Sequence, residues 1–346
     1  MSDSQPNVIY LKDYQVPSYL IEHTSLDFQL AEEVTRVTAV LKVRLNPACT
    51  QEQPAFDLFG HESLEAEALS IDGVPVAQEN ITRAGEVLSI AQVPEAFEFR
   101  CVTLIKPQEN TALEGLYKSD GMFCTQCEAE GFRRITFYPD RPDVMSIFST
   151  TVRADKSLYP VLLSNGNPVE SGESSEGQHW VRWEDPHPKP AYLFALVAGD
   201  LQHTESSFTT ASGRDVIIRV FAEEKDLDKL SYSVESLKNA MRWDEEVYGR
   251  EYDLDIYMIV AVDFFNMGAM ENKGLNIFNT SCVLAHPSTT TDAGFQRVEG
   301  VVAHEYFHNW SGNRVTCRDW FQLSLKEGFT VFRDAEFSAD MNSRTV

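Results

Sequence analysis

Cysteine is scarce in this chain of 346 residues, which contains six of them. They are scattered and lack the dense, regular spacing of a disulfide framework in a small secreted domain. Cys124 and Cys127 form one C-x-x-C pair, but a zinc ribbon needs a second pair, and none of suitable spacing exists. We therefore expect the cysteines to be reduced.

Basic residues are also few. The sequence has 29 Lys and Arg against 53 Asp and Glu, which gives a formal net charge of −24. Nucleic acids and anionic membrane surfaces bind basic proteins, so this charge argues against both as partners. Solubility is the plainer explanation of the acidic excess.

Long apolar runs are absent. No stretch approaches the roughly 20 apolar residues that a membrane-spanning helix needs. Residues 1–6 have neither the basic nor the apolar region of a secretory signal peptide. We expect no membrane partner and a cytoplasmic location.

The chain nevertheless has enough apolar residues, 43% of the total, for at least two domains with their own cores. In the first part, apolar and polar residues alternate in runs such as 38–45 and 97–102, and turn signals such as Asn165-Gly166 separate these runs. The pattern predicts an antiparallel, all-β, sandwich-like domain over residues 1–200.

The pattern then changes. Residues 185–190, with three prolines, interrupt the alternation, and residues 191–197 are expected to form one more apolar strand. Beyond them, apolar residues recur at helical spacing over 230–241, and residues 254–262 alternate as in a strand. We therefore expect a mixed α/β domain over residues 201–346.

Two histidines in this second part have metal-binding spacing. His304 and His308 are four residues apart, which places both imidazoles on one helix face, where they can bind a single metal ion. Thr291 as a cap and Gly312-Asn313 as a stop signal support a helix here. Glu327 follows His308 after 18 residues, and two His with one Glu are a standard ligand set for catalytic zinc.

Two nearby carboxylates leave alternatives open. Residues 324–327 also match a capping box, in which Glu327 would only bind a backbone N–H. Asp334 lies two helical turns beyond Glu327, so it could orient a ligand histidine. A solvated surface aspartate is at least an equal interpretation.

Two further segments carry a family resemblance. Residues 268–272 read Gly-Ala-Met-Glu-Asn, and residues 126–133 read Gln-Cys-Glu-Ala-Glu-Gly-Phe-Arg. Together with the H-E-x-x-H motif and Glu327, they resemble the gluzincin aminopeptidases of the aminopeptidase N family, and residues 266–267 and 327–333 are most similar to its bacterial cytosolic members. The resemblance implies a thermolysin-like zinc peptidase domain after the β domain, with one zinc ion per chain.

The ligand set indicates a hydrolytic mechanism. Zinc held by His304, His308 and Glu327 lowers the pKa of its bound water, while Glu305 takes the proton of that water as general base. By resemblance, Glu271 binds the free ammonium group of a peptide. Without the resemblance, the segments around it would be ordinary strand, turn or core residues. The substrate-binding residues that it implies are Gln126, Glu128, Met267, Gly268, Ala269, Met270 and Glu271.

The resemblance does not extend to the family's full length. The family adds largely helical C-terminal domains, and its oxyanion-stabilising tyrosine lies beyond the part matched here. We expect an N-terminal fragment of a zinc aminopeptidase, inactive alone, whose partners are peptides with a free N-terminus and the remaining domains of a longer parent. Two alternatives stay open. One is a non-catalytic protein that binds zinc and peptide ends. The other is an epoxide-hydrolase-type relative, although a pentapeptide with Ala269, as at residues 268–272 here, is unusual in that branch.

Overall fold

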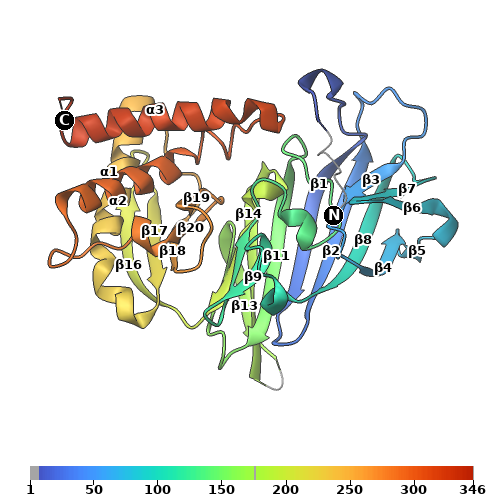
Figure 1. Ribbon diagram of the computed structural model, residues 1–346, viewed down its shortest axis with the longest axis horizontal. Coiled ribbons are helices and arrows are strands. Elements are labelled where there is room, and N and C mark those ends of the chain that lie inside the picture. Colours follow the sequence, from blue (N-terminus) through green and yellow to red (C-terminus); the bar gives the residue numbers. More distant parts are fainter. Residues whose placement is uncertain (1–7, 175–176, 346) are drawn as a thin grey trace, which may run out of the picture.

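The computed structural model describes residues 8–174 and 177–345. Figure 1 shows that strands form almost all of the first part, whereas long helices and a sheet form the second. The all-β N-terminal domain and the mixed α/β domain that follows it in the sequence, both predicted from the sequence, are thus confirmed.

An eight-stranded sheet dominates the N-terminal part, with strand order β13-β14-β11-β1-β2-β8-β4-β5. Neighbouring strands are antiparallel except for β1 and β11, which run parallel. The predicted runs at residues 38–45 and 97–102 fall within β2 and β8. The strands are β1 (Tyr19–Gln29), β2 (Thr35–Leu45), β4 (Ala66–Ile71), β5 (Val74–Pro75), β8 (Ala96–Ile105), β11 (Ser146–Asp155), β13 (Asn167–Glu173) and β14 (Gln178–Lys189).

Two smaller sheets share one apolar core with the large sheet. Phe28 and Phe99 of the large sheet lie in the same buried cluster as Phe56 and Phe123 of the small ones, so the arrangement is sandwich-like. The first small sheet contains β3 (Phe56–Phe59), β7 (Val87–Ile90) and β6 (Ile81–Ala84); the second contains β12 (Val161–Ser164), β15 (Leu196–Gly199), β10 (Met122–Gln126) and β9 (Gly115–Ser119).

The prolines of residues 185–190 do not interrupt the strand, contrary to the prediction. β14 continues to Lys189, and its register with β11 shifts between the Phe148–Asp185 and Ser146–Lys189 pairs. Proline is tolerated at such an irregularity because ladder hydrogen bonds are missing there. The predicted strand at 191–197 is instead a 3₁₀ turn (Ala191–Leu193) followed by β15. All of its residues are buried, so periodicity could not separate the two.

The C-terminal part is a five-stranded sheet with helices. Its order is β16-β17-β18-β20-β19, in which β17, β18 and β20 are parallel neighbours. The helix predicted from residues 230–241 is α1, which ends at Gly249 in a left-handed conformation with φ of 64°. The elements are β16 (Gln202–Thr209), β17 (Asp215–Ala222), α1 (Ser231–Tyr248), β18 (Ile256–Val262), β19 (Ala269–Met270), β20 (Leu275–Asn279), α2 (Asp292–Phe307) and α3 (Leu323–Met341).

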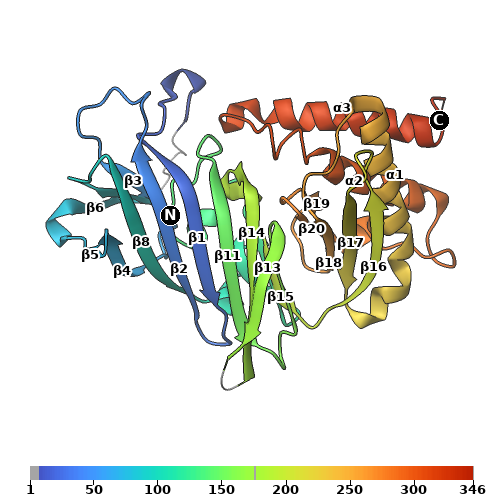
Figure 2. The same cartoon turned by 180° about the vertical axis from the view of Figure 1, so that it is seen from behind.

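A separate apolar cluster joins the N-terminal and C-terminal parts. Cys124 and Val197 of the four-stranded sheet lie in one buried group with Val260 and Ile277 of the five-stranded sheet. This packing brings the end of β10 close to β19, and Figure 2 shows α3 extending across the second part with one end directed toward the first. The chain passes from the four-stranded sheet to the five-stranded sheet between β15 and β16. The exact domain division at residue 200 stays a prediction. Among the described residues, no helix combines the length and apolarity that crossing a bilayer requires.

Candidate active site

Helix α2 presents the two histidines as a pair. It begins with Thr291, whose side chain accepts a hydrogen bond from the Gly294 amide, and its apolar face is buried. His304 and His308 lie one turn apart, with their Nε2 atoms separated by 3.0 Å. The helix ends at Phe307, earlier than the stop signal at Gly312-Asn313 suggested.

Helix α3 brings the third donor. Glu327 Oε2 lies 3.5 Å from His304 Nε2 and 3.4 Å from His308 Nε2, and the three residues form one potential metal-binding group. Because α3 begins at Leu323 and Gln322 occupies its N-cap without a side-chain bond, the capping-box interpretation of Glu327 is wrong. Arg333 fixes α3 against the end of α2 by donating to the Phe307 carbonyl at 2.9 Å.

The outer nitrogen of each imidazole has its own acceptor. His304 Nδ1 lies 2.5 Å from Asp334 Oδ2, and His308 Nδ1 lies 2.7 Å from the Ser311 carbonyl. A carbonyl only accepts, and an ionised carboxylate only accepts, so each Nδ1 carries the proton. Both Nε2 atoms therefore remain on the side that faces Glu327, and two ring nitrogens and one carboxylate around one point are a donor set that suits a cation.

This donor set fits zinc. Two imidazole nitrogens and one carboxylate are a known catalytic set, and outer partners such as Asp334 usually orient the ligand histidines. Gly312 contributes by its lack of a side chain: its φ is 141°, and a Cβ there would lie 2.9 Å from His308 Nδ1. Asp334 thus contacts His304, and it is not the solvated aspartate of the alternative interpretation.

Glu305 lies on α2 between the histidines and is buried. Burial raises its pKa well above the usual range; His304 lowers that pKa, while Glu271 and Glu327 raise it further. A carboxyl with a raised pKa is suited to proton transfer near neutral pH. Glu305 is not among the three grouped donors.

A second cluster, which we call the carboxylate cluster, adjoins the first and consists of Glu128, Glu271 and Glu327. Its centre is the Lys326 ammonium, whose Nζ lies 2.8 Å from Glu128, 2.6 Å from Glu271 and 2.5 Å from Glu327. Lys326 is only 2% exposed. The sequence interpretation missed it, because a single lysine beside Glu327 has no pattern of its own.

The two buried glutamates titrate differently. Burial and the neighbouring Glu271 raise the pKa of Glu128 to about 7, although Lys326 opposes this shift. Burial would also raise the pKa of Glu271, but His308 and Lys326 outweigh it, and the pKa falls below the usual value. Glu271 is therefore the more firmly ionised of the pair.

The substrate segment predicted at residues 267–271 forms one wall of this cluster. Ala269 and Met270 make up β19, which pairs with β20, and the Gly268 carbonyl accepts from the Asn279 amide at 2.9 Å. Gln126, at the end of β10, contacts the sulfur of Met267 at 3.2 Å and that of Met270 at 3.7 Å. Met267 is exposed, whereas Gln126 and Met270 are buried, so the last two support the wall.

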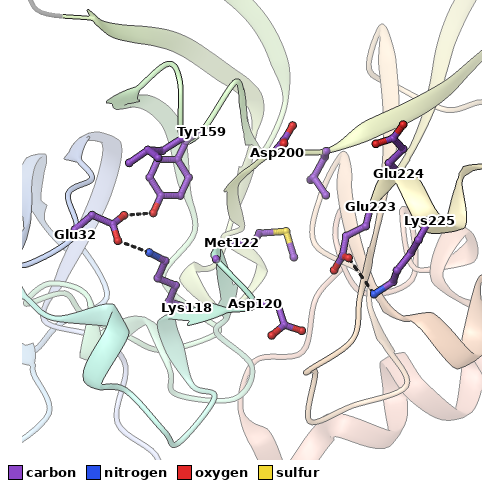
Figure 3. A pocket seen from close by; sticks show the side chains of 12 residues that line it. Glu32, Lys118, Asp120, Met122, Tyr159, Asp200, Glu223, Glu224 and Lys225 are labelled. Carbon is purple, nitrogen blue, oxygen red and sulfur yellow. Dashed lines mark hydrogen bonds and ion pairs between the residues drawn. The ribbon is translucent and has the colours of Figure 1, made fainter.

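Among the described residues, one other group brings three carboxylates together, away from the candidate site. A cavity of about 500 Å³ lies between the β9–β10 hairpin and the end of β17 (Figure 3). Asp120, Glu223 and Asp263 approach one another near it. The Lys225 ammonium lies 2.9 Å from Glu223 and 2.9 Å from Asp263 and offsets one of the three charges. Exposed acidic groups of this kind are common without a metal ion, so this surface group carries no metal assignment.

Comparison with known proteins identifies relatives of this chain. The model of the peptidase family M1 domain matches residues 232–346, and that of the peptidase M1 N-terminal domain matches residues 22–193. The chain is 54% identical to aminopeptidase N of Haemophilus influenzae over 97% of its own length and 38% of that protein, and 54% identical to aminopeptidase N of Escherichia coli over 99% and 39%. The crystal structure of Legionella pneumophila aminopeptidase A in complex with aspartic acid superposes with a TM-score of 0.93 at 39% identity, covering 96% of this chain and 39% of that one. The chain therefore spans about two fifths of the length of these relatives.

The contact between Asp334 and His304 leads to a prediction about metal affinity. In the protein that carries the C-terminal domains, Asp334→Ala should weaken zinc binding by roughly 10- to 100-fold, because His304 loses the partner that fixes its ring and tautomer. Competition with a chelator measures the affinity. Glu336→Ala is the matched control, since it removes an exposed carboxylate from the same helix. Equal affinities of the two variants would show that Asp334 does not orient the ligand.

Proposed function

Because the chain belongs to peptidase family M1, we propose that it is the zinc- and amine-binding part of an aminopeptidase, which removes single residues from the amino end of peptides. The observation that carries this proposal is that Glu327 belongs both to the metal-binding group and to the carboxylate cluster, so the two adjoin. Glu271 Oε1 lies 3.9 Å from His308 Nδ1. A peptide whose ammonium group binds at the carboxylates would therefore present its first peptide bond at the metal ligands.

Three residues would hold one zinc ion: His304 and His308 through Nε2, and Glu327 through its carboxylate. When bound, zinc would lower the pKa of a water molecule and polarise the carbonyl of the bond to be cleaved. His304 is held for this role by Asp334, and His308 by the Ser311 carbonyl.

Glu305 would act as the general base. Its burial raises its pKa, so in the ionised form the carboxylate has the proton affinity to accept the proton of the attacking water and can then donate it to the departing amine. The same side chain would serve both steps. No covalent intermediate with the protein is required.

The carboxylate cluster would bind the peptide's ammonium group by charge-assisted hydrogen bonds. Three carboxylates surround one lysine, so a net negative charge remains for a second cation. Glu271, which is the more firmly ionised, would be the principal anchor, with Glu128 beside it. The remaining proposed substrate-binding residues are Gln126, Met267, Gly268, Ala269 and Met270.

The outer face of α3 supports a further part of the proposal. Leu325, Phe329 and Phe332 recur at helical spacing, and they are 67%, 49% and 54% exposed. Exposed apolar stripes of this kind usually mark interfaces. We propose that C-terminal domains like those of the longer relatives cover this face, and that peptides with a free N-terminus are the other partners.

A cytoplasmic location agrees with the state of the cysteines. The described structure contains all six as free thiols, and five of them are buried. A reducing compartment suits such a protein. Recovery of the protein from a periplasmic or secreted fraction would contradict this location.

The first prediction about the reaction concerns the general base. In the protein that carries the C-terminal domains, Glu305→Gln should lower turnover of an aminoacyl amide by about a hundredfold or more, because the proton acceptor is lost while the metal donors remain. Elemental analysis should find zinc unchanged. Near-normal turnover at full zinc content would rule out Glu305 as the base.

A second prediction concerns the amine anchor. Glu271→Ala should reduce kcat/KM for a peptide with a free amino end by at least about tenfold, since both the ammonium contact and the placement of the scissile bond are affected. The measurement compares a free peptide with its N-acetylated form. If parent and variant show the same ratio between the two substrates, Glu271 is not the anchor.

The third prediction concerns the 346-residue chain expressed alone. It should bind zinc poorly and show little peptidase activity, because the exposed face of α3 would lack its cover and metal binding depends on the fold that presents the donors. It would also lack the tyrosine that stabilises the oxyanion in the aminopeptidase N family. Loss of such a donor lowers the reaction rate by roughly two to three orders of magnitude. Zinc content, dispersity by light scattering and turnover are the readouts. A monodisperse, zinc-loaded and fully active fragment would contradict the prediction.

A further inference from the structure

Lys273 follows the proposed anchor Glu271 by two residues and is a buried lysine that the proposed reaction does not use. It is 1% exposed. Its ammonium group pairs with Asp253 and donates to Asn309 Oδ1 at 2.7 Å. The Asn309 amide in turn donates to Asp253 Oδ1 at 3.1 Å. Lys273, Asp253 and Asn309 therefore form a closed triangle of polar contacts, which we call the buried triangle.

Asn309 directly follows the metal donor His308. The buried triangle thus ties the segment that carries Glu271 to the end of the helix that carries the histidines. Arg314 also pairs with Asp253, which holds the turn after α2 to the same carboxylate. The proposed anchor Glu271 is two residues from Lys273, and the proposed metal donor His308 is next to Asn309, so both are close to the buried triangle along the chain.

The backbone of Lys273 is held from the other side by the N-terminal part of the chain. Asn165 Nδ2 donates to the Lys273 carbonyl at 2.9 Å and to the Leu193 carbonyl at 2.9 Å. The Asn165 Oδ1 accepts from the Ala195 amide at 2.8 Å. The Lys273 side chain and main chain are therefore fixed by different parts of the molecule.

Stability alone is a weak explanation for this arrangement. Burial lowers the pKa of Lys273, so its charge is kept at a cost that Asp253 offsets. An apolar group of similar volume often stabilises a protein as well as a buried ion pair does. Directed contacts instead define where each partner lies.

We propose that Lys273 is a positioning residue, which sets the distance between the amine anchor Glu271 and the metal donor His308 and thereby sets the register at which a peptide is cut. This inference rests on the proposed function. If the inference is correct, loss of the Lys273 ammonium weakens the binding of ligands that contact both the metal and Glu271. The affinity of ligands that contact the metal alone stays unchanged.

Two hydroxamates test this requirement in the protein that carries the C-terminal domains. The hydroxamate of L-alanine reaches both the metal and the amine anchor, whereas acetohydroxamate reaches only the metal. Lys273→Met should weaken binding of the first by about tenfold or more and change the second by less than about twofold, since misplacement of one of two anchors costs only the ligand that uses both. Isothermal titration calorimetry on zinc-loaded protein gives both affinities.

The controls separate the inference from the proposed function. Lys225→Met removes a lysine that pairs with two carboxylates at the surface and should change neither affinity. The parent should prefer the alanine hydroxamate, and Glu271→Ala should abolish that preference; a parent without any preference would overturn the proposed function itself.

Asn309→Ala covers the case in which Lys273→Met does not fold. It keeps the Lys273–Asp253 pair but removes the contact beside His308, and it should show the same selective loss at smaller size, about threefold or more. Selective loss in Lys273→Met, or in Asn309→Ala if the first variant does not fold, supports the inference. Equal loss of both ligands, or no loss, in Lys273→Met, or in Asn309→Ala if the first variant does not fold, overturns it.

Discussion

The buried ammonium of Lys326 is the interaction on which the candidate site depends. Glu128, Glu271 and Glu327 all place an oxygen within 4.8 Å of one another. At an effective dielectric constant of about 20, two such charges repel by roughly 3 kcal/mol, and three pairs would not stay together in a closed site. A single cation that contacts all three removes most of this repulsion. It also joins β10, the loop before β20, and α3.

The features that were predicted from the sequence are those contained in one element. The i, i+4 spacing of His304 and His308 lies within a single helix, so periodicity suffices to place the two rings together. Glu327 was identified by its spacing and by resemblance, and its location on a second helix left the capping-box interpretation open until the start of α3 was known. Glu128 is 143 positions from Glu271, and only resemblance connected them.

The features that were missed depend on tertiary contacts. Lys326, Asn165 and Asp253 follow no sequence pattern, because their roles come from partners 20 or more positions away. The prolines after Asp185 misled the strand assignment for a related reason: proline excludes a ladder hydrogen bond, but the irregular register of β14 against β11 does not require one there. The sequence of a segment shows which backbone hydrogen bonds it cannot make, whereas the neighbouring strand determines which of those bonds the fold needs.

The site draws on elements that are far apart along the chain. Gln126 is the last residue of β10 and Glu128 follows it by two positions, in the first half of the sequence, whereas Glu327 and Asp334 lie on α3. During synthesis the ribosome therefore releases the wall that we propose binds the amine long before Glu327. A nascent chain that has not yet exposed α3 lacks one of the three grouped donors, so the proposed metal site can form only after this helix has been made.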